Sequence, residues 1–193
     1  FSQQGFGTVV TGTVISGKVD TGDKVNILPI NKIARLRSLQ THHDNVTSLK
    51  IRDRGALNLH GIEKERIKRG YHLSNQQFFK SVYQFIGKIA VSKNSSIALK
   101  QDQRLRFHIG TSEAIGRISI CKKNNIQSNE EEVCLIKLEE PVVTSFQDRF
   151  LIRTYSPMKI VGGGIVEDIE CLGKWSQLKK YALKLSLQEK IED

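Results

Sequence analysis

The sequence predicts an all-β protein made of two antiparallel β-barrels and a short C-terminal helix. Short runs of alternating polar and apolar residues, rich in Val, Ile and Thr, recur along the chain, as in strands that bury one face. Gly, Asn and Asp residues, which favour turns, separate these runs. A helical period of apolar residues appears only after residue 172. The core must therefore be built from strands.

The first predicted domain covers residues 1–76 and contains five short strands. These are expected at 7–14, 24–29, 33–39, 56–59 and 71–73. In the run 33–39 arginines occupy one face and aliphatic residues the other. A polar join at 74–77 ends the domain. Short strands without helices between them favour a barrel over alternating strands and helices.

The second predicted domain covers residues 77–172 and repeats this pattern. Its strands are expected at 78–91, 104–109, 114–121, 133–138, 150–154 and 160–166, with an exposed polar loop at 122–132. In the tail, 173–193, apolar residues recur three or four positions apart, which predicts a helix. These residues are Trp175, Leu178, Ala182 and Leu185. We expect this helix to link the barrels to a further C-terminal region.

Composition excludes several classes of protein. Of the 193 residues, 38% are hydrophobic, which suits a packed core rather than a disordered chain. No apolar stretch is long enough for a membrane helix, and no secretory leader is recognisable, so we expect no membrane partner. The chain starts at Phe1 without an initiator Met, and we expect it to be part of a longer protein. Three widely spaced cysteines favour buried thiols in a reducing compartment, hence the cytoplasm.

The net charge of +10 favours association with polyanions. Residues 1–76 carry twelve Lys and Arg against six Asp and Glu, residues 77–172 carry thirteen against eleven, and residues 173–193 carry five against three. The positive excess is therefore concentrated in the first domain.

Glycine and histidine motifs give no nucleotide, metal or catalytic site. Residues 5–12 are rich in glycine, but the chain has no GxxxxGK[ST] motif. We interpret these glycines, and Gly162–Gly164, as sites of strand bending or close backbone approach. His42 and His43 are adjacent, and on an extended chain they would point to opposite faces, so we expect a surface pair without metal. No set of residues resembles a catalytic centre, and we expect no enzyme activity from this chain.

Several stretches resemble the second and third domains of translational GTPases, and within them the selenocysteine-specific elongation factors. In the first half these are Gly5–Thr13, Ser16-Gly17-x-Val19, Gly22-Asp23, Arg37-Ser38-Leu39-Gln40-x-His42, Ala56-Leu57-Asn58-Leu59-x-Gly61-Ile62 and Arg69-Gly70. In the second half they are Phe107–Glu113, Leu138–Val143, Asp148-Arg149-Phe150, Tyr155-Ser156-Pro157 and Gly162–Gly164. The chain departs from the family pattern at Ser2–Gln4 and at Gln147.

The resemblance implies two barrels of the translation-factor type in a GTP-dependent carrier of selenocysteinyl-tRNA to the ribosome. A domain that binds GTP and Mg²⁺ would precede Phe1, and domains that read a messenger RNA hairpin would follow Asp193. The chain itself would hold no cofactor and would act as a monomer.

The resemblance also assigns residues to this task. Arg54, with His42 as a neighbouring donor, would face the selenocysteine side chain, because a permanent cation favours a selenolate over a neutral serine. Glu65 and Arg69 would flank the 3′ end of the tRNA. Contacts to the tRNA backbone are expected from Arg35, Arg37 and Arg153.

Two other interpretations remain open. The chain could be the barrel part of a general elongation factor Tu-like GTPase or of a sulfate-activating relative, which would share the fold without the selenocysteine pocket. It could also be a standalone β-barrel that binds proteins, whose basic surface is incidental.

Overall fold

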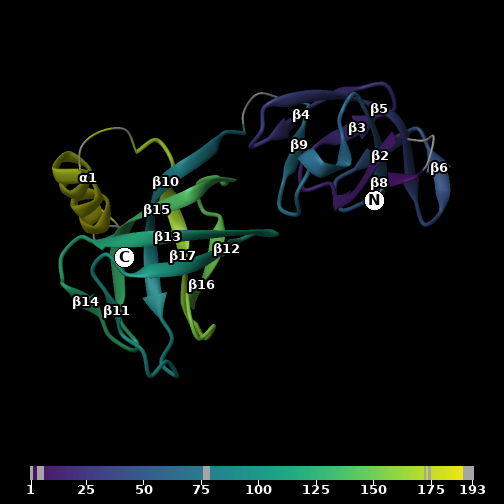
Figure 1. The fold of residues 1–193 in the computed structure, drawn as a ribbon. Helices are drawn as coiled ribbons and strands as arrows, with labels where there is room; N and C mark the ends of the chain where they lie inside the picture. Colours follow the sequence, from purple (N-terminus) through teal and green to yellow (C-terminus); the bar gives the residue numbers. More distant parts are fainter. Residues whose placement is uncertain (1, 4–6, 76–78, 172, 174, 189–193) are drawn as a thin grey trace. The chain divides into compact units, whose positions relative to one another are not determined.

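The computed structural model describes residues 2–3, 7–75, 79–171, 173 and 175–188 (Figure 1). The chain divides into two compact units, Phe1–Lys80 and Ser81–Asp193, and each is described by itself. Strands dominate both, so the predicted all-β fold with two antiparallel barrels and one short helix is confirmed. The domain boundaries expected at residues 76 and 172 fall on positions outside the described residues.

The first unit is a seven-stranded antiparallel sheet with a separate two-stranded ribbon. The sheet order is β1 (Ser2–Gln3), β2 (Gly7–Thr13), β8 (Arg54–His60), β5 (Lys32–Thr41), β4 (Lys24–Leu28) and β9 (His72–Ser74), and β6 (Asp44–Val46) pairs with β5. The ribbon consists of β3 (Lys18–Asp20) and β7 (Ser48–Lys50). A single 3-10 turn, η1 (Lys64–Arg66), lies between β8 and β9.

The core of the first unit follows the alternation read from the sequence. On β5, Ala34 and Leu36 are buried while Arg35 is exposed, as expected for a strand with one face inside. The alternation then shifts by one residue, because Arg37 is an extra residue in a β-bulge between Leu36 and Ser38. The buried cluster contains Val25, Ile27, Ala34, Leu36, Leu39, Leu49 and Leu59.

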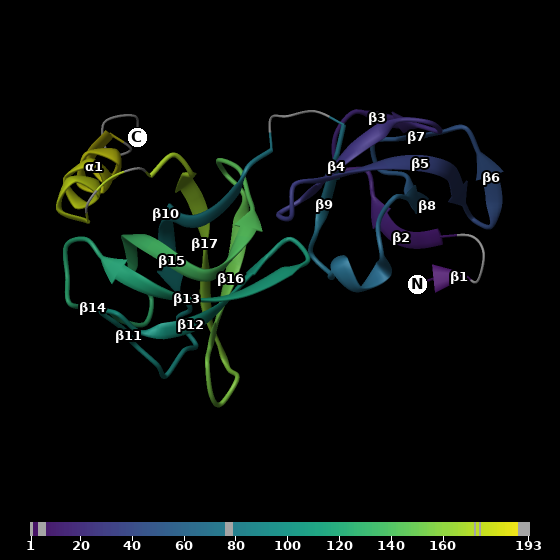
Figure 2. The ribbon, with the colours of Figure 1, turned by 45° about the horizontal axis from the view of Figure 1, so that its top comes forward.

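The second unit is a closed six-stranded antiparallel barrel (Figure 2). Around the barrel the order is β10 (Ser81–Val91), β15 (Glu131–Val143), β13 (Ser112–Ile120), β12 (Arg104–Ile109), β16 (Arg149–Thr154) and β17 (Ile160–Asp168). Closure leaves no free edge in this sheet. The first strand of this domain was predicted to start at Phe78, which lies outside the described residues. The strand in the structure, β10, starts at Ser81.

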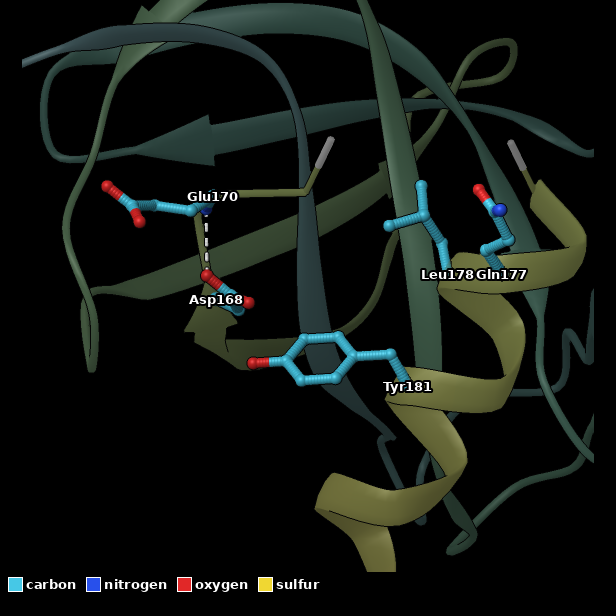
Figure 3. A pocket seen from close by; sticks show the side chains of 5 residues that line it. All are labelled: Asp168, Glu170, Gln177, Leu178 and Tyr181. Carbon is cyan, nitrogen blue, oxygen red and sulfur yellow. Dashed lines mark hydrogen bonds between the residues drawn. The ribbon is translucent and has the colours of Figure 1, made fainter. Parts of the chain in front are cut away.

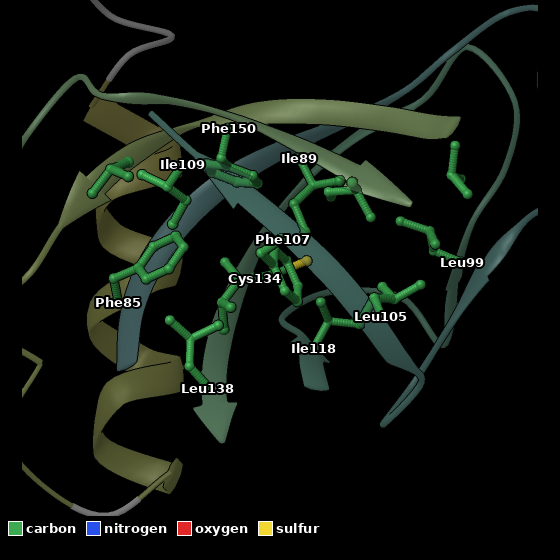
Figure 4. Packing of buried hydrophobic residues seen from close by; sticks show 14 of the residues in the cluster. Phe85, Ile89, Leu99, Leu105, Phe107, Ile109, Ile118, Cys134, Leu138 and Phe150 are labelled. Atoms are coloured by element: carbon green, nitrogen blue, oxygen red, sulfur yellow. The ribbon is translucent and has the colours of Figure 1, made fainter. Parts of the chain in front are cut away.

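Three phenylalanines centre the barrel core (Figure 4). The rings of Phe85 and Phe107 both pack against Phe150, with ring centroids 5.5 Å and 6.1 Å from it. Glycines of β17 let the backbones of its two neighbours, β10 and β16, approach β17 closely. A Cβ on Gly164 would meet the ring of Phe150, and one on Gly162 would meet the backbone of Ala90. The prediction of close backbone approach at the glycine run is confirmed.

The prediction of an exposed loop at 122–132 is partly wrong. It contains β14 (Asn125–Ile126), which pairs with β11 (Leu99–Lys100), and Ile126 is fully buried. The predicted loop also extends into β15, which starts at Glu131. Ile126 is the only large aliphatic residue between Lys122 and Glu132, and it belongs to the buried cluster of the barrel core.

The C-terminal helix α1 (Trp175–Gln188) packs against β15. Leu178 and Ala182 are buried in a cluster with Cys121 and Cys171, which confirms these two positions as its apolar face. The side chains of Trp175 and Leu185 lie outside the described ones. Among the described residues, no helix has the length and apolar character needed to cross a membrane.

Candidate functional site

Arg54 and the turn at His42 lie at the same end of the first unit. Arg54 opens β8, opposite Thr13 of β2. His42 and His43 form the two-residue turn between β5 and β6, with φ angles of 50° and 74°. The Thr41 hydroxyl donates a hydrogen bond to the Arg54 carbonyl oxygen over 3.0 Å, so the turn is attached directly to the start of β8.

Both histidines are exposed, as expected for a surface pair, but the reason given from the sequence is wrong. The sequence interpretation placed them on an extended chain, whereas they occupy a tight turn with left-handed backbone at both positions. Hairpins of this kind usually carry Asn-Gly or Asp-Gly, and histidine tolerates positive φ better than most residues. No cluster of three metal-ligating side chains occurs within the described ranges.

The Arg54 side chain is exposed, and no carboxylate neutralises it within the described part of the chain. Two acidic residues lie close to Arg54 in the sequence or in the loop after β8, and both have other partners. Asp53 accepts a hydrogen bond from the backbone N–H of Lys50 at 2.9 Å, and Glu63 pairs with Arg66 at 3.3 Å. Arg54 therefore presents a full positive charge to any ligand at this end of the unit.

Glu65 and Arg69 lie in the connection between β8 and β9. Both are exposed, and Glu65 is part of η1. The connection is anchored to β2, because the Thr8 hydroxyl donates to the carbonyl oxygen of Ile62 over 2.7 Å. No hydrogen bond or ion pair joins these two residues to Arg54 among the interactions of the described residues. The structure thus places them on one loop and does not bring them into contact with Arg54.

Arg35 and Arg37 are both exposed on β5. The Nε–H of Arg35 donates to the carbonyl oxygen of Gly22 over 3.3 Å, and its cross-strand partners are Lys24 and His60. Arg37 projects from the bulge. The two side chains therefore form a basic strip along the outer face of the first unit.

Arg153 belongs to a second basic region, on the outside of the second barrel. It lies directly across from Arg106 on the neighbouring strand, and its Nε is buried without a hydrogen-bond partner among the described residues. Arg104 contributes a further guanidinium to this face. Arg104 and Arg106 were missed in the sequence interpretation, although their alternation with Leu105 and Phe107 already indicated an outward orientation.

The second unit also has a surface pocket of about 440 Å³ between the end of β17 and α1 (Figure 3). It is lined by Asp168, Glu170, Gln177, Leu178 and Tyr181. Asp168 accepts a hydrogen bond from the backbone N–H of Glu170 at 2.8 Å. The hydrogen bond between the Tyr181 hydroxyl and Asp168 raises the pKa of that hydroxyl. Asp168 is thus held by its neighbours in this pocket, and the acidic rim formed by Asp168 and Glu170 does not suit RNA.

Family models match both units. Residues 7–74 match domain 2 of elongation factor Tu. Residues 86–171 match the β-barrel domain of selenocysteine-specific elongation factor.

Individual relatives agree with the family models. The selenocysteine-specific elongation factor of Desulfomicrobium baculatum is 30% identical over 85% of this chain and 26% of its own length. That of Methanocaldococcus jannaschii is 32% identical over 87% of this chain and 39% of its own length. Elongation factor 1-alpha of Pyrobaculum calidifontis is 44% identical, over only 36% of this chain. The chain thus spans between a quarter and two fifths of the selenocysteine-specific relatives.

Solved structures show the same arrangement of strands. The crystal structure of a bacterial selenocysteine-specific elongation factor matches 96% of this chain and 29% of its own, with a TM-score of 0.78 and 27% identity. The apo form of translation elongation factor SelB from Methanococcus maripaludis matches 92% of this chain and 42% of its own, with a TM-score of 0.75 and 28% identity.

Proposed function

Because this chain carries the two β-barrel domains of the selenocysteine-specific elongation factor family, we propose that it is the tRNA-binding part of a GTP-dependent factor. That factor delivers selenocysteinyl-tRNA to the ribosome. The relatives and the family models make the chain part of a translation elongation factor, and the choice of cargo is our proposal.

The observation that carries the cargo assignment is the unneutralised Arg54 beside the His42 turn. A selenol is far more acidic than the hydroxyl of serine, so the cargo side chain is largely an anion at neutral pH. A guanidinium keeps its charge when a bound ligand covers it, and it can donate several hydrogen bonds at once. Arg54, supported by His42, would therefore favour selenocysteine over its serine precursor.

The basic regions of the two units support binding along the tRNA backbone. Arg35 and Arg37 would contact phosphates from the first unit, and Arg153 with its neighbour Arg106 from the second. Glu65 and Arg69, on the loop between β8 and β9, would lie against the terminal adenosine. These contacts position the tRNA but do not distinguish one cargo from another.

A general elongation factor is the alternative that shares most of these features. Over 36% of this chain, elongation factor 1-alpha of Pyrobaculum calidifontis is 44% identical, a higher identity than the selenocysteine-specific relatives show over most of the chain. The match of the second unit to the selenocysteine-specific barrel favours our assignment. GTP, Mg²⁺, the ribosome and a messenger RNA hairpin would be contacted by other regions of the factor.

The tRNA-binding role is tested by the salt dependence of binding. We expect the 193-residue chain to bind tRNA at low salt and to lose affinity steeply as salt rises, because binding phosphates releases counterions. Replacing Arg35 and Arg37 by Gln should lower the slope of log K against log salt by about 1–2. The matched control, Lys179→Gln with Lys180→Gln on α1, should leave the slope nearly unchanged. Absence of binding at low salt would contradict the role.

A further inference from the structure

Two arginines of β12 converge on one aromatic ring of the second unit. Arg104 and Arg106 point outward on β12, and Tyr155 directly follows the last residue of β16, the neighbouring strand. The Cζ atoms of the two guanidiniums lie 4.4 Å and 5.0 Å from the centroid of the Tyr155 ring. Both distances are within the range of cation–π contact. One ring therefore contacts two cations that would otherwise repel each other.

Two carboxylates, one on β13 and one on β15, bind the same two arginines. Arg104 donates from Nε and Nη2 to the two oxygens of Glu139, both over 2.7 Å. Arg106 donates from Nη1 to Glu113 over 2.6 Å and from Nε to the Tyr155 carbonyl oxygen over 3.4 Å. Such charge-assisted pairs are geometrically specific. The planes of both guanidiniums are therefore set before any ligand arrives.

These contacts leave hydrogen-bond donors unused. A guanidinium has five N–H donors. The hydrogen bonds to Glu139 occupy Nε and Nη2 of Arg104, which also interacts with the Tyr155 hydroxyl, and Nη2 of Arg106 makes no hydrogen bond among the described residues. Arg153, next to Arg106 across the strand pair, adds a third cation. Three guanidiniums face two carboxylates here, so the face keeps a positive excess.

We propose that Tyr155 is the positioning residue of a phosphodiester-binding face made by Arg104, Arg106 and Arg153. The ligand class is the backbone of RNA, and the proposal rests on the tRNA-binding role proposed above. Tyr155 holds the two β12 arginines side by side. Glu139 and Glu113 assist it, and the phosphates of the bound RNA accept from the free N–H groups.

The role of the Tyr155 ring is tested by measuring the Kd for deacylated tRNA of two Tyr155 variants and one control variant. Tyr155→Leu keeps an apolar side chain without the ring and should raise Kd about fivefold or more. Tyr155→Phe keeps the ring and should bind within about twofold of the wild type. Tyr83→Leu removes another exposed tyrosine of the same barrel, on β10, and should also stay within about twofold. Equal affinity of Tyr155→Leu and the wild type would overturn the proposal, as would an equal loss in Tyr155→Phe.

A second readout reports positioning without RNA. The ¹⁵N relaxation of the Arg104 Nε–Hε group should show a rigid side chain in the wild type and in Tyr155→Phe, and a mobile one in Tyr155→Leu. An Arg104 side chain that stays equally rigid in Tyr155→Leu would refute the positioning role. Thermal unfolding of each variant shows whether the fold is kept, which we expect because 40% of Tyr155 is exposed.

The outcomes separate this inference from the proposed function. If the wild type binds tRNA with a steep salt dependence, and Arg153→Gln weakens binding while Tyr155→Leu does not, only the role of Tyr155 is wrong. If the wild type fails to bind tRNA at low salt, the tRNA-binding role itself is wrong, and this inference is overturned with it.

Discussion

The Thr41 hydroxyl donates to the backbone carbonyl of Arg54, with 3.0 Å between the two oxygen atoms. This bond connects the last residue of β5 to the first residue of β8. It fixes the turn that carries His42 relative to the strand that carries Arg54. Two side chains that lie twelve positions apart in the sequence are thereby brought to one end of the first unit, where our proposal places the cargo side chain.

Adding one methyl group within the glycine run of β17 should lower the stability of the protein strongly. Gly162→Ala should destabilise the protein by about 1–3 kcal/mol or more, because its Cβ would overlap the backbone of Ala90 on β10, which cannot move aside easily. Gly12→Ala is the matched control on β2, where nothing lies within 4 Å of the added Cβ, and it should change stability by at most about 0.5 kcal/mol. Chemical denaturation measures both. Equal effects would show that the strands are not packed as described.

Buried thiols predict slow modification of the native protein. Burial raises the pKa of Cys121 and of Cys171 to about 11, and it also raises the pKa of Cys134. Because only the thiolate attacks a disulfide reagent, all three cysteines should react at least about a hundredfold more slowly in native protein than in guanidinium chloride. Ellman's reagent follows the reaction by absorbance. A thiol that reacts rapidly in native protein would place it at the surface.

The Arg104–Glu139 pair predicts a specific acid sensitivity. The hydrogen bonds from Arg104 hold the pKa of the Glu139 carboxyl below its ordinary 4.5. A carboxyl whose pKa is lowered by folding stabilises the protein above its unfolded pKa, and this contribution is lost as the pH falls through the folded pKa. The difference in Tm between wild type and Glu139→Gln should therefore be present at neutral pH and disappear between about pH 5 and pH 2. A difference that does not vary with pH would contradict this account.

The sequence predicted the features that depend on local patterns. The exposure of Arg35 follows from the two-residue period of β5, and the burial of Leu178 and Ala182 from the period of α1. These periods are set by backbone geometry, so they can be read without knowing which strands are neighbours.

Features that depend on strand pairing could not be predicted in this way. Tyr155 meets Arg104 and Arg106 because β16 pairs with β12 in one particular register, although about fifty residues separate them along the chain. The burial of Ile126 requires a partner, β11, in a distant loop. The tight turn at His42 was missed because neither of its residues is Asn or Gly.

The central claim is that Arg54 recognises an anionic cargo side chain, and Arg54→Ala in the full-length factor tests it most directly. Dissociation constants for selenocysteinyl-tRNA and seryl-tRNA would be measured for the wild type, Arg54→Ala, Arg54→Lys and Arg52→Gln. Arg52 is an exposed arginine two positions away, and its replacement removes the same charge from the same end of the unit.

A charge pair that bound tRNA partly shields from water contributes about 1–4 kcal/mol, and the exposure of Arg54 in this chain places the expectation toward the lower end. We predict that Arg54→Ala weakens selenocysteinyl-tRNA binding about fivefold to tenfold and changes seryl-tRNA binding less than about twofold. Arg54→Lys should restore part of the loss, and Arg52→Gln should affect both tRNAs alike. Equal losses for the two tRNAs in Arg54→Ala would contradict the claim.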